Sequence, residues 1–290
     1  RWPVATPPSG LASVSREAAD GRLRAAASRK LTSIGPLGAE TAKGSLRLGR
    51  EGSWWAVGKR PQLEWMVTRV ARIVSAHPEA HLRPLRILDV GGGRGLLANQ
   101  LARHLGANRA QLRVLDIAQA PVAKGLRDAR WRGLSNVEFL LLDASVAAPR
   151  GAERPDVVVA LHACGALSDV ALHLAAQSGA AFCVCGCCFR KVRRLAVGGG
   201  SAAAWLGVPP EELDALTSAA ELQDQAATAT EAMHTVSALR AEAVRRHWQP
   251  SDGEGGAGLE LMDVHVECFP QEYSRCNFCV VGDPLTPAPG

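Results

Sequence analysis

The sequence predicts an α/β fold: a doubly wound, mostly parallel seven-stranded sheet with an antiparallel C-terminal strand. Three patterns in the 290 residues support this prediction. Short apolar runs alternate with helical stripes from residue 86 onward, which is typical of a parallel sheet covered by helices on both faces. A glycine-rich turn at 91–95 joins the first run to its helix. The last two apolar runs follow each other without a helix between them, which favours antiparallel pairing.

Each element is predicted from its own periodicity. Pro61 opens a helix over 61–76, whose apolar residues form one stripe. Five strands expected to pair in parallel follow, over 86–90, 112–117, 137–144, 155–165 and 180–188. The helices between them are expected over 96–106, 121–132 and 167–179. Two alanine-rich helices near 210–222 and 228–247 precede a turn at 251–258 and the closing strands, over 259–271 and 275–284.

Composition divides the chain into an extension and one domain. Three prolines in the first 15 residues and an Arg/Ala-rich helical pattern over 16–32 predict a flexible or helical extension over 1–53. Residues 54–290 are expected to form a Rossmann-like domain. Because residues 191–258 are polar and rich in Ala and Gly, we interpret them as a helical or loop insertion into that domain.

The charge balance is mildly basic. The net charge is +5, which is compatible with RNA or phosphate contacts and equally with Arg-rich codon usage. Aromatic residues make up 4% of the chain, which argues against an RNA surface built on stacked Phe and Tyr. No run of about 18 apolar residues lacks a charge, so we expect no transmembrane helix and no membrane partner.

The number and spacing of the cysteines indicate in which cellular compartment the protein resides. Four of the eight cysteines fall within residues 183–188, a crowding unlike a secreted disulfide framework. We therefore expect a reduced, cytoplasmic location. The alternative is an organelle, since residues 1–50 carry nine Arg/Lys against three acids, as transit peptides do.

The glycine turn is the first motif with chemistry. Gly91, Gly93 and Gly95 lie between a strand and a helix, where backbone N–H groups approach a ligand. Asp89 precedes the turn, and we expect Asp116 at the next strand end to meet a ribose diol. A carboxylate before the turn would repel a pyrophosphate. The pattern therefore favours S-adenosylmethionine over a nicotinamide dinucleotide.

Further cofactor contacts are expected beside this turn. Asp143, at the end of the third strand, is placed to meet the adenine amino group, and Ala144 and Leu161 are expected to line the same site. Acids at three successive strand ends suit a nucleoside that carries a positive centre.

The segment His162-Ala163-Cys164-Gly165 lies at the carboxyl end of the fourth strand, where ligands bind in this fold. His162 could orient or deprotonate a methyl acceptor. Cys164 could act as a nucleophile if its pKa is lowered. The alternative for both is a packed turn in which His162 is hydrogen-bonded to the backbone.

The cysteine-rich segment is not expected to bind metal. In a strand, Cys183, Cys185 and Cys187 share one face and cannot all be tetrahedral ligands unless the chain bends. We interpret these thiols as core filling, with Cys187 or Cys188 as possible lining of the active site. The basic cluster that follows, Arg190 to Arg194, could meet a phosphate backbone or be solvated.

Several of these segments resemble one family. LDVGGGRGLLANQLA and VLDIA resemble class I S-adenosylmethionine-dependent methyltransferases. HACG followed by Ser-Asp, with CC and an aromatic after strand five, resembles a subgroup of that class. This subgroup includes the methyltransferase domain of the glutathione S-transferase C-terminal domain-containing protein and relatives of ribosomal RNA adenine dimethylases. The resemblance covers roughly 58–190 and 259–284, although Gly186 stands where the subgroup usually has Pro.

The resemblance implies a methyltransferase that uses S-adenosylmethionine and acts on RNA, either tRNA or rRNA. It places His162 and Cys164 at the methyl-transfer site, with Asp169 on the following helix. The alternatives are a non-catalytic cofactor-binding scaffold and a methyltransferase for proteins or small molecules. A rarer possibility is covalent catalysis at a pyrimidine C5 through Cys164.

Overall fold

A computed structural model describes residues 58–146, 154–191, 195–248 and 262–284. All of them fall within one of the two compact units of the chain, Leu48–Gly290. Seven strands form one sheet in the order β3-β2-β1-β4-β5-β7-β6, with β6 and β7 joined to it by antiparallel pairing. The strands are β1 (Leu85–Val90), β2 (Ala110–Asp116), β3 (Val137–Leu141), β4 (Val157–Leu161), β5 (Ala181–Cys185), β6 (Met262–Cys268) and β7 (Phe278–Pro284). The predicted fold class is confirmed.

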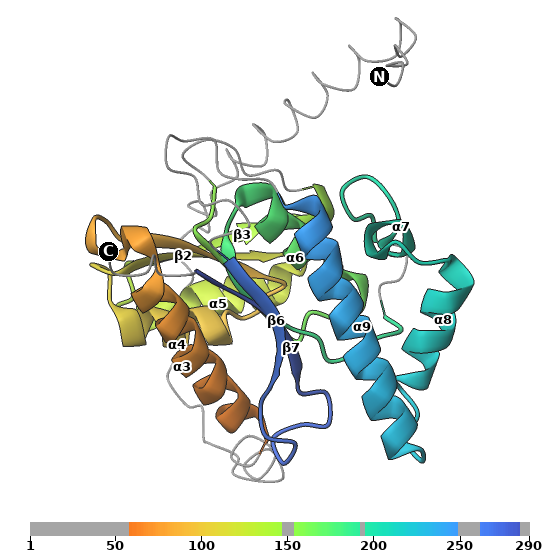
Figure 1. Cartoon of the computed structure of the whole chain (residues 1–290). Helices are drawn as coiled ribbons and strands as arrows, with labels where there is room; N and C mark the ends of the chain where they lie inside the picture. The colour runs from red at the N-terminus through yellow and green to blue at the C-terminus, as the bar shows by residue number, and fades with distance from the viewer. Residues whose placement is uncertain (1–57, 147–153, 192–194, 249–261, 285–290) are drawn as a thin grey trace, which may run out of the picture. The chain divides into compact units, whose positions relative to one another are not determined.

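The direction in which the sheet grows reverses between β1 and β4. From β1 the chain adds β2 and β3 on one side, and from β4 it adds β5 on the other. Right-handed crossovers therefore place α4 (Leu96–Leu105) and α5 (Gln119–Trp131) on one face and α6 (Ala166–Ser178) on the opposite face (Figure 1). α3 (Arg60–Ala76) packs with α4, whereas α9 (Ala226–His247) packs with α6. Ligands bind at such a reversal, outside the carboxyl ends of the strands.

The central strands are continuously apolar because both of their faces are covered. Every residue of β4 and β5 is buried, and their sequences, VVVAL and AFCVC, lack the alternation of a half-exposed strand. The two strands pair in parallel from Val157 opposite Ala181 to Leu161 opposite Cys185. This register brings the carboxyl ends of both strands to the same level, so the loops that follow them meet.

Four strands, β3 to β6, end three or four residues earlier than the sequence predicts, and the ends of β3 and β4 have a local reason. β3 stops at Leu141 because Asp143 Oδ1 accepts hydrogen bonds from Ser145 and starts a short 3-10 helix, η3 (Ala144–Val146). β4 stops at Leu161 because His162 adopts a φ of 66°. β5 stops at Cys185, so the expectation that Cys187 shares a strand face with Cys183 is wrong.

Three helices connect β5 to β6 within the described residues 195–248. They are α7 (Ala202–Leu206), α8 (Pro210–Ala219) and α9, and α8 packs along α9 (Figure 1). The sequence predicted α8 and α9 but not α7, whose single turn is capped by the Ser201 hydroxyl and ended by Gly207. The helix expected at 16–32, the boundary at residue 53 and the turn at 251–258 lie outside the described residues.

None of the helices in the described ranges is long and apolar enough to cross a membrane.

Candidate active site

The glycine turn after β1 has open space on one side. Gly91, Gly93 and Gly95 all have positive φ values, between 55° and 67°. A Cβ added at Gly93 would have its nearest neighbour, Asp116 Oδ2, at 3.8 Å, which is ordinary contact. Gly93 is therefore needed for its backbone conformation, and the space beside it is free for a ligand.

Asp116, at the end of β2, is tied to this turn. Its Oδ2 accepts a hydrogen bond from the Gly93 N–H at 2.9 Å, and its Oδ1 accepts one from the Ala118 N–H at 2.8 Å. Each carboxylate oxygen keeps a second lone pair for a ligand hydroxyl. The next residue, Ile117, is 71% exposed. An apolar side chain left open beside an acid is a signal that sequence reasoning missed.

Asp89 lies beneath the turn and is only 1% exposed. Its Oδ2 has no hydrogen-bond partner within the part of the chain that the structure describes. Burial, helped by the charge of Asp116, raises the pKa of Asp89 to about 7. A buried carboxylate oxygen without a partner fits a ligand that brings positive charge or hydrogen-bond donors to this turn.

The remaining expected cofactor residues lie at neighbouring strand ends. Asp143 Oδ1 is engaged by the Ser145 hydroxyl at 2.7 Å, Ala144 is buried in η3, and Leu161 closes β4 with 9% of its surface exposed. The open glycine turn, a carboxylate at the end of β2 and the apolar Ile117 fit a nucleoside.

His162 is the only non-glycine residue with a positive φ among the described residues. Such a conformation costs free energy and is concentrated at functional sites. Its backbone N–H donates to Cys185 O at 3.0 Å, but its buried Nε2 has no partner in the described ranges. The alternative in which the backbone satisfies this atom is thus not seen. Burial, helped by the charge of Lys59, lowers the pKa of His162 to about 4, so the imidazole is neutral at pH 7.

Cys164 meets two further thiols. Its Sγ lies 3.3 Å from Cys187 Sγ, and Cys187 Sγ lies 3.7 Å from Cys188 Sγ. A hydrogen bond from Cys187 lowers the pKa of Cys164 to about 6, while the same interaction raises the pKa of Cys187. The sequence placed Cys187 in a strand. Instead, the chain bends after Cys185 and turns this thiol toward Cys164.

The two loops that carry these groups touch through their backbones. We call residues 162–165 the β4 loop and residues 186–191 the β5 loop. The Gly165 N–H donates to Cys188 O at 2.5 Å. A Cβ at Gly165 would lie 1.6 Å from Lys191 O, and the residue has a φ of 53°. Only glycine permits this approach, which fixes the β4 loop against the β5 loop.

Lys59 reaches the site from the start of α3, and sequence reasoning did not single it out. Its charge acts on Asp89, Cys164 and Cys187, and burial lowers the pKa of its ammonium. α3 is held in place from the far end of the chain, because Gln62 Nε2 donates to Tyr273 O at 2.6 Å. Arg69 also pairs with Glu267 at 2.5 Å. This anchoring sets the position of Lys59.

Arg240 on α9 supports the β4 loop from behind. It forms two hydrogen bonds to the Asp169 carboxylate, at 2.9 and 3.1 Å, and a third to Gly165 O at 3.0 Å. Arg240 and Asp169 are both buried. Asp169 lies on α6, as the resemblance implied, and it helps to position the β4 loop through Arg240. Nothing near Arg240 in the sequence indicates a partner 71 residues earlier.

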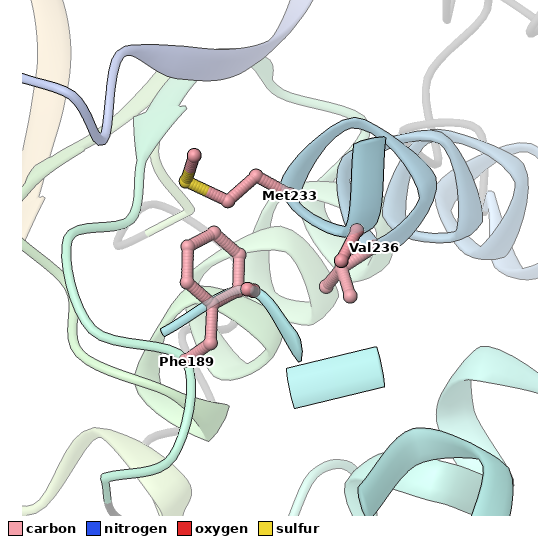
Figure 2. Packing of buried hydrophobic residues seen from close by; sticks show 5 residues of the cluster. Phe189, Met233 and Val236 are labelled. Atoms are coloured by element: carbon pink, nitrogen blue, oxygen red, sulfur yellow. The ribbon is translucent and has the colours of Figure 1, made fainter. Parts of the chain in front are cut away.

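The β5 loop is anchored by the same helical region. Phe189 packs with Met233 and Val236 of α9 in a buried cluster, and the three side chains converge in Figure 2. Glu221 accepts hydrogen bonds from the backbone N–H groups of Phe189 and Arg190, both at 2.8 Å. The segment between β5 and β6 thus holds both loops of the site.

One family model and several solved structures match the chain. Residues 58–195 match the model of a family described as a methyltransferase domain. No match is found among curated proteins. Many solved structures are similar to the chain. Three of them, all methyltransferases, have TM-scores below 0.5.

The first is phosphoethanolamine N-methyltransferase 2 of Haemonchus contortus, at 18% identity over 41% of this chain and 27% of that one, with a TM-score of 0.32. The second is magnesium protoporphyrin IX methyltransferase of Synechocystis, at 12% identity over 84% and 90%, with a TM-score of 0.45. The third is an rRNA methylase of Streptococcus thermophilus, at 9% identity over 74% and 93%, with a TM-score of 0.40. The match to the Haemonchus enzyme thus spans about a quarter of that protein.

Proposed function

We propose that this S-adenosylmethionine-dependent methyltransferase modifies RNA, either tRNA or rRNA, and that His162 orients the acceptor group. The model of a methyltransferase-domain family matches residues 58–195, which supports S-adenosylmethionine as the cofactor. The observation that carries the proposal is the strained, partly buried and neutral His162, whose buried Nε2 lacks a partner among the described residues. It lies at the carboxyl end of β4, where the acceptor must approach.

The cofactor half of the proposal rests on the turn after β1. Gly91, Gly93 and Gly95 would hold the cofactor against the backbone, with Asp89 beneath them. Asp116 would bind the ribose hydroxyls, and Asp143 with Ala144 would meet the adenine edge, while Leu161 would line the site from β4. The cofactor supplies an electrophilic methyl group on a sulfonium centre. The chain has to hold the acceptor in line with that methyl group and exclude water.

The acceptor half rests on the chemistry of His162. A neutral imidazole accepts a hydrogen bond from an N–H or O–H group, and it can draw off the proton as the acceptor is methylated. Lys59 supports this role because its charge opposes protonation of the imidazole. Cys164 would line the acceptor side of the same site.

Three features support RNA as the acceptor. The net charge is +5, and Arg190 and Lys191 are exposed at the end of the β5 loop. Phosphates are commonly bound by such side chains. The HACG and CC-aromatic segments also resemble those of proteins related to RNA methyltransferases.

The eight cysteines are all free thiols, which supports a reduced compartment, and we propose the cytoplasm.

The first experiment measures cofactor binding. We expect calorimetric titration to give micromolar binding of S-adenosylmethionine and S-adenosylhomocysteine, with no binding of NADH. Asp116→Ala should weaken this binding by about 10- to 100-fold, because it removes charge-assisted hydrogen bonds to the ribose. His162→Asn should leave it unchanged. Unaltered affinity in folded Asp116→Ala would contradict the assignment of Asp116.

The second experiment measures methyl transfer. Tritiated methyl groups should pass from the cofactor to a fraction of total RNA and not to protein. His162→Asn should lower this transfer by about 10²- to 10⁴-fold, because Asn tolerates the positive φ but lacks the imidazole. Label in protein or small molecules would overturn the RNA acceptor. Cofactor binding without transfer to any fraction would favour a non-catalytic scaffold.

A further inference from the structure

We propose that Cys164, Cys187 and Cys188 form a three-thiolate site for a zinc ion. The three Sγ atoms all lie within 4.8 Å of one another. They come from both loops of the active site, because Cys164 belongs to the β4 loop and the other two belong to the β5 loop. This inference is independent of the nature of the methyl acceptor.

The spacing of the sulfur atoms suits tetrahedral zinc. A Zn–S bond is about 2.3 Å long, so two sulfurs on one tetrahedral ion lie about 3.8 Å apart. The separation between Cys187 and Cys188 is 3.7 Å, and that between Cys164 and Cys187 is 3.3 Å. The third separation, between Cys164 and Cys188, is at most 4.8 Å, so shifts of about 1 Å or less would admit the ion. The contact between Gly165 N and Cys188 O already holds the loops together.

The surroundings suit a thiophilic cation. Three thiolates with one Zn²⁺ leave a net charge of −1, and the charges of Lys59 and Lys191 both act on Cys164. Two nearby ammonium groups therefore offset the excess negative charge. Thiolate ligands favour zinc or copper(I) over magnesium and calcium, which prefer oxygen. All three cysteines are partly buried, which limits the competition from water.

Three protein ligands leave the fourth position of the tetrahedron open. Zinc sites of this type hold a water molecule or a substrate atom there. The other five cysteines are not part of the cluster: Cys183, Cys185 and Cys279 are buried in the sheet, Cys276 is partly buried just before β7, and Cys268 is exposed on β6. This separation provides matched controls within the same chain.

The test is metal binding by the whole chain under reducing conditions. After removal of metal with a chelator, titration with Zn²⁺ against a chromophoric competitor should give one site per chain. Cobalt(II) in place of zinc should give thiolate-to-metal charge-transfer absorption and the visible bands of a tetrahedral ion. Cys164→Ser, Cys187→Ser and Cys188→Ser should each weaken Zn²⁺ binding by at least about 100-fold. Cys268→Ser should leave it unchanged.

A second measurement needs no substitution and therefore does not depend on whether a variant folds. Bound Zn²⁺ should protect Cys164, Cys187 and Cys188 of the unaltered chain from alkylation, as mapped by mass spectrometry, while Cys268 reacts at the same rate with and without the metal. The proposal is overturned if Zn²⁺ fails to bind, or if protection falls on other cysteines. It is also overturned if binding persists in folded serine variants of the cluster.

Discussion

The two halves of the proposed site, a cofactor side at the turn 91–95 and an acceptor side at the β4 loop, are built in different ways. On the cofactor side, the turn 91–95 and Asp116 follow neighbouring strands, and 23 residues separate the hydrogen-bonded Gly93 and Asp116. On the acceptor side, the β4 loop is held by Arg240, which lies 71 residues from Asp169 and 75 from Gly165. The first half depends on local backbone geometry, and the second depends on contacts that form only after the chain has closed on itself.

This difference has an energetic consequence. The cofactor side can lose a side-chain contact and keep its fold, because the turn 91–95 is continuous with β1 and α4. The β4 loop on the acceptor side is held by a few buried groups, chiefly Arg240 and Asp169. Removing one of them leaves a buried charge or a backbone carbonyl without its hydrogen-bond partner. Substitutions should therefore be most damaging on the acceptor side.

The largest effect is expected for Gly165→Ala. The new Cβ would lie 1.6 Å from a backbone oxygen, so the two loops would have to separate. We expect a loss of more than about 4 kcal/mol in the free energy of unfolding, measured with urea. The matched control is Gly133→Ala, where φ is +69° but no atom lies within 4 Å of the added Cβ. It should cost only about 1 kcal/mol. Equal losses would show that the loop contact is unimportant.

A smaller effect is expected for Arg240→Met. It leaves the Asp169 carboxylate buried without its partner, which should lower the free energy of unfolding by about 3–5 kcal/mol. The comparison on the cofactor side is Arg113→Met, which breaks a pair with Glu138 in which both side chains are about 40% exposed. That change should cost less than about 1 kcal/mol. If thermal or urea unfolding ranks the two variants the other way, the contrast between the two sides fails.

The smallest effect concerns pH, and the two sides should respond in opposite directions. His162 has a pKa of about 4 when folded and about 6.5 when unfolded, so only the unfolded chain takes up its proton between these values. Lowering the pH from 6.5 to 4 should therefore remove up to about 3 kcal/mol of stability. Burial raises the pKa of Asp89 above its unfolded value of 3.8 to about 7, so raising the pH across this interval should remove stability.

Urea titrations between pH 4 and pH 7 can separate these two effects. His162→Asn should abolish the loss on the acid side, and Asp89→Asn should abolish the loss as the pH rises toward 7. A pH dependence that is the same in both variants and in the unaltered chain would contradict the two pKa shifts.

Much of the cofactor side was predictable from the sequence because its pattern is local. Glycines with positive φ, an acid at the end of β2 and the apolar strands each leave a mark in adjacent residues. The ends of the strands were less predictable. Four were expected to run further. In two of them, β3 and β4, a side-chain turn at Asp143 and the positive φ of His162 interrupt a run that remains apolar.

The sequence alone determined the order of the strands and helices, the glycine turn and the expectation of chemistry at His162 and Cys164. Only the tertiary structure decided that Cys187 leaves its strand to meet Cys164, that Lys59 enters the site and that Arg240 supports the β4 loop. The physical reason is distance along the chain. Periodicity and turn propensity act over a few residues, whereas a buried ion pair or a thiol cluster exists only where the packed sheet and helices bring remote segments together.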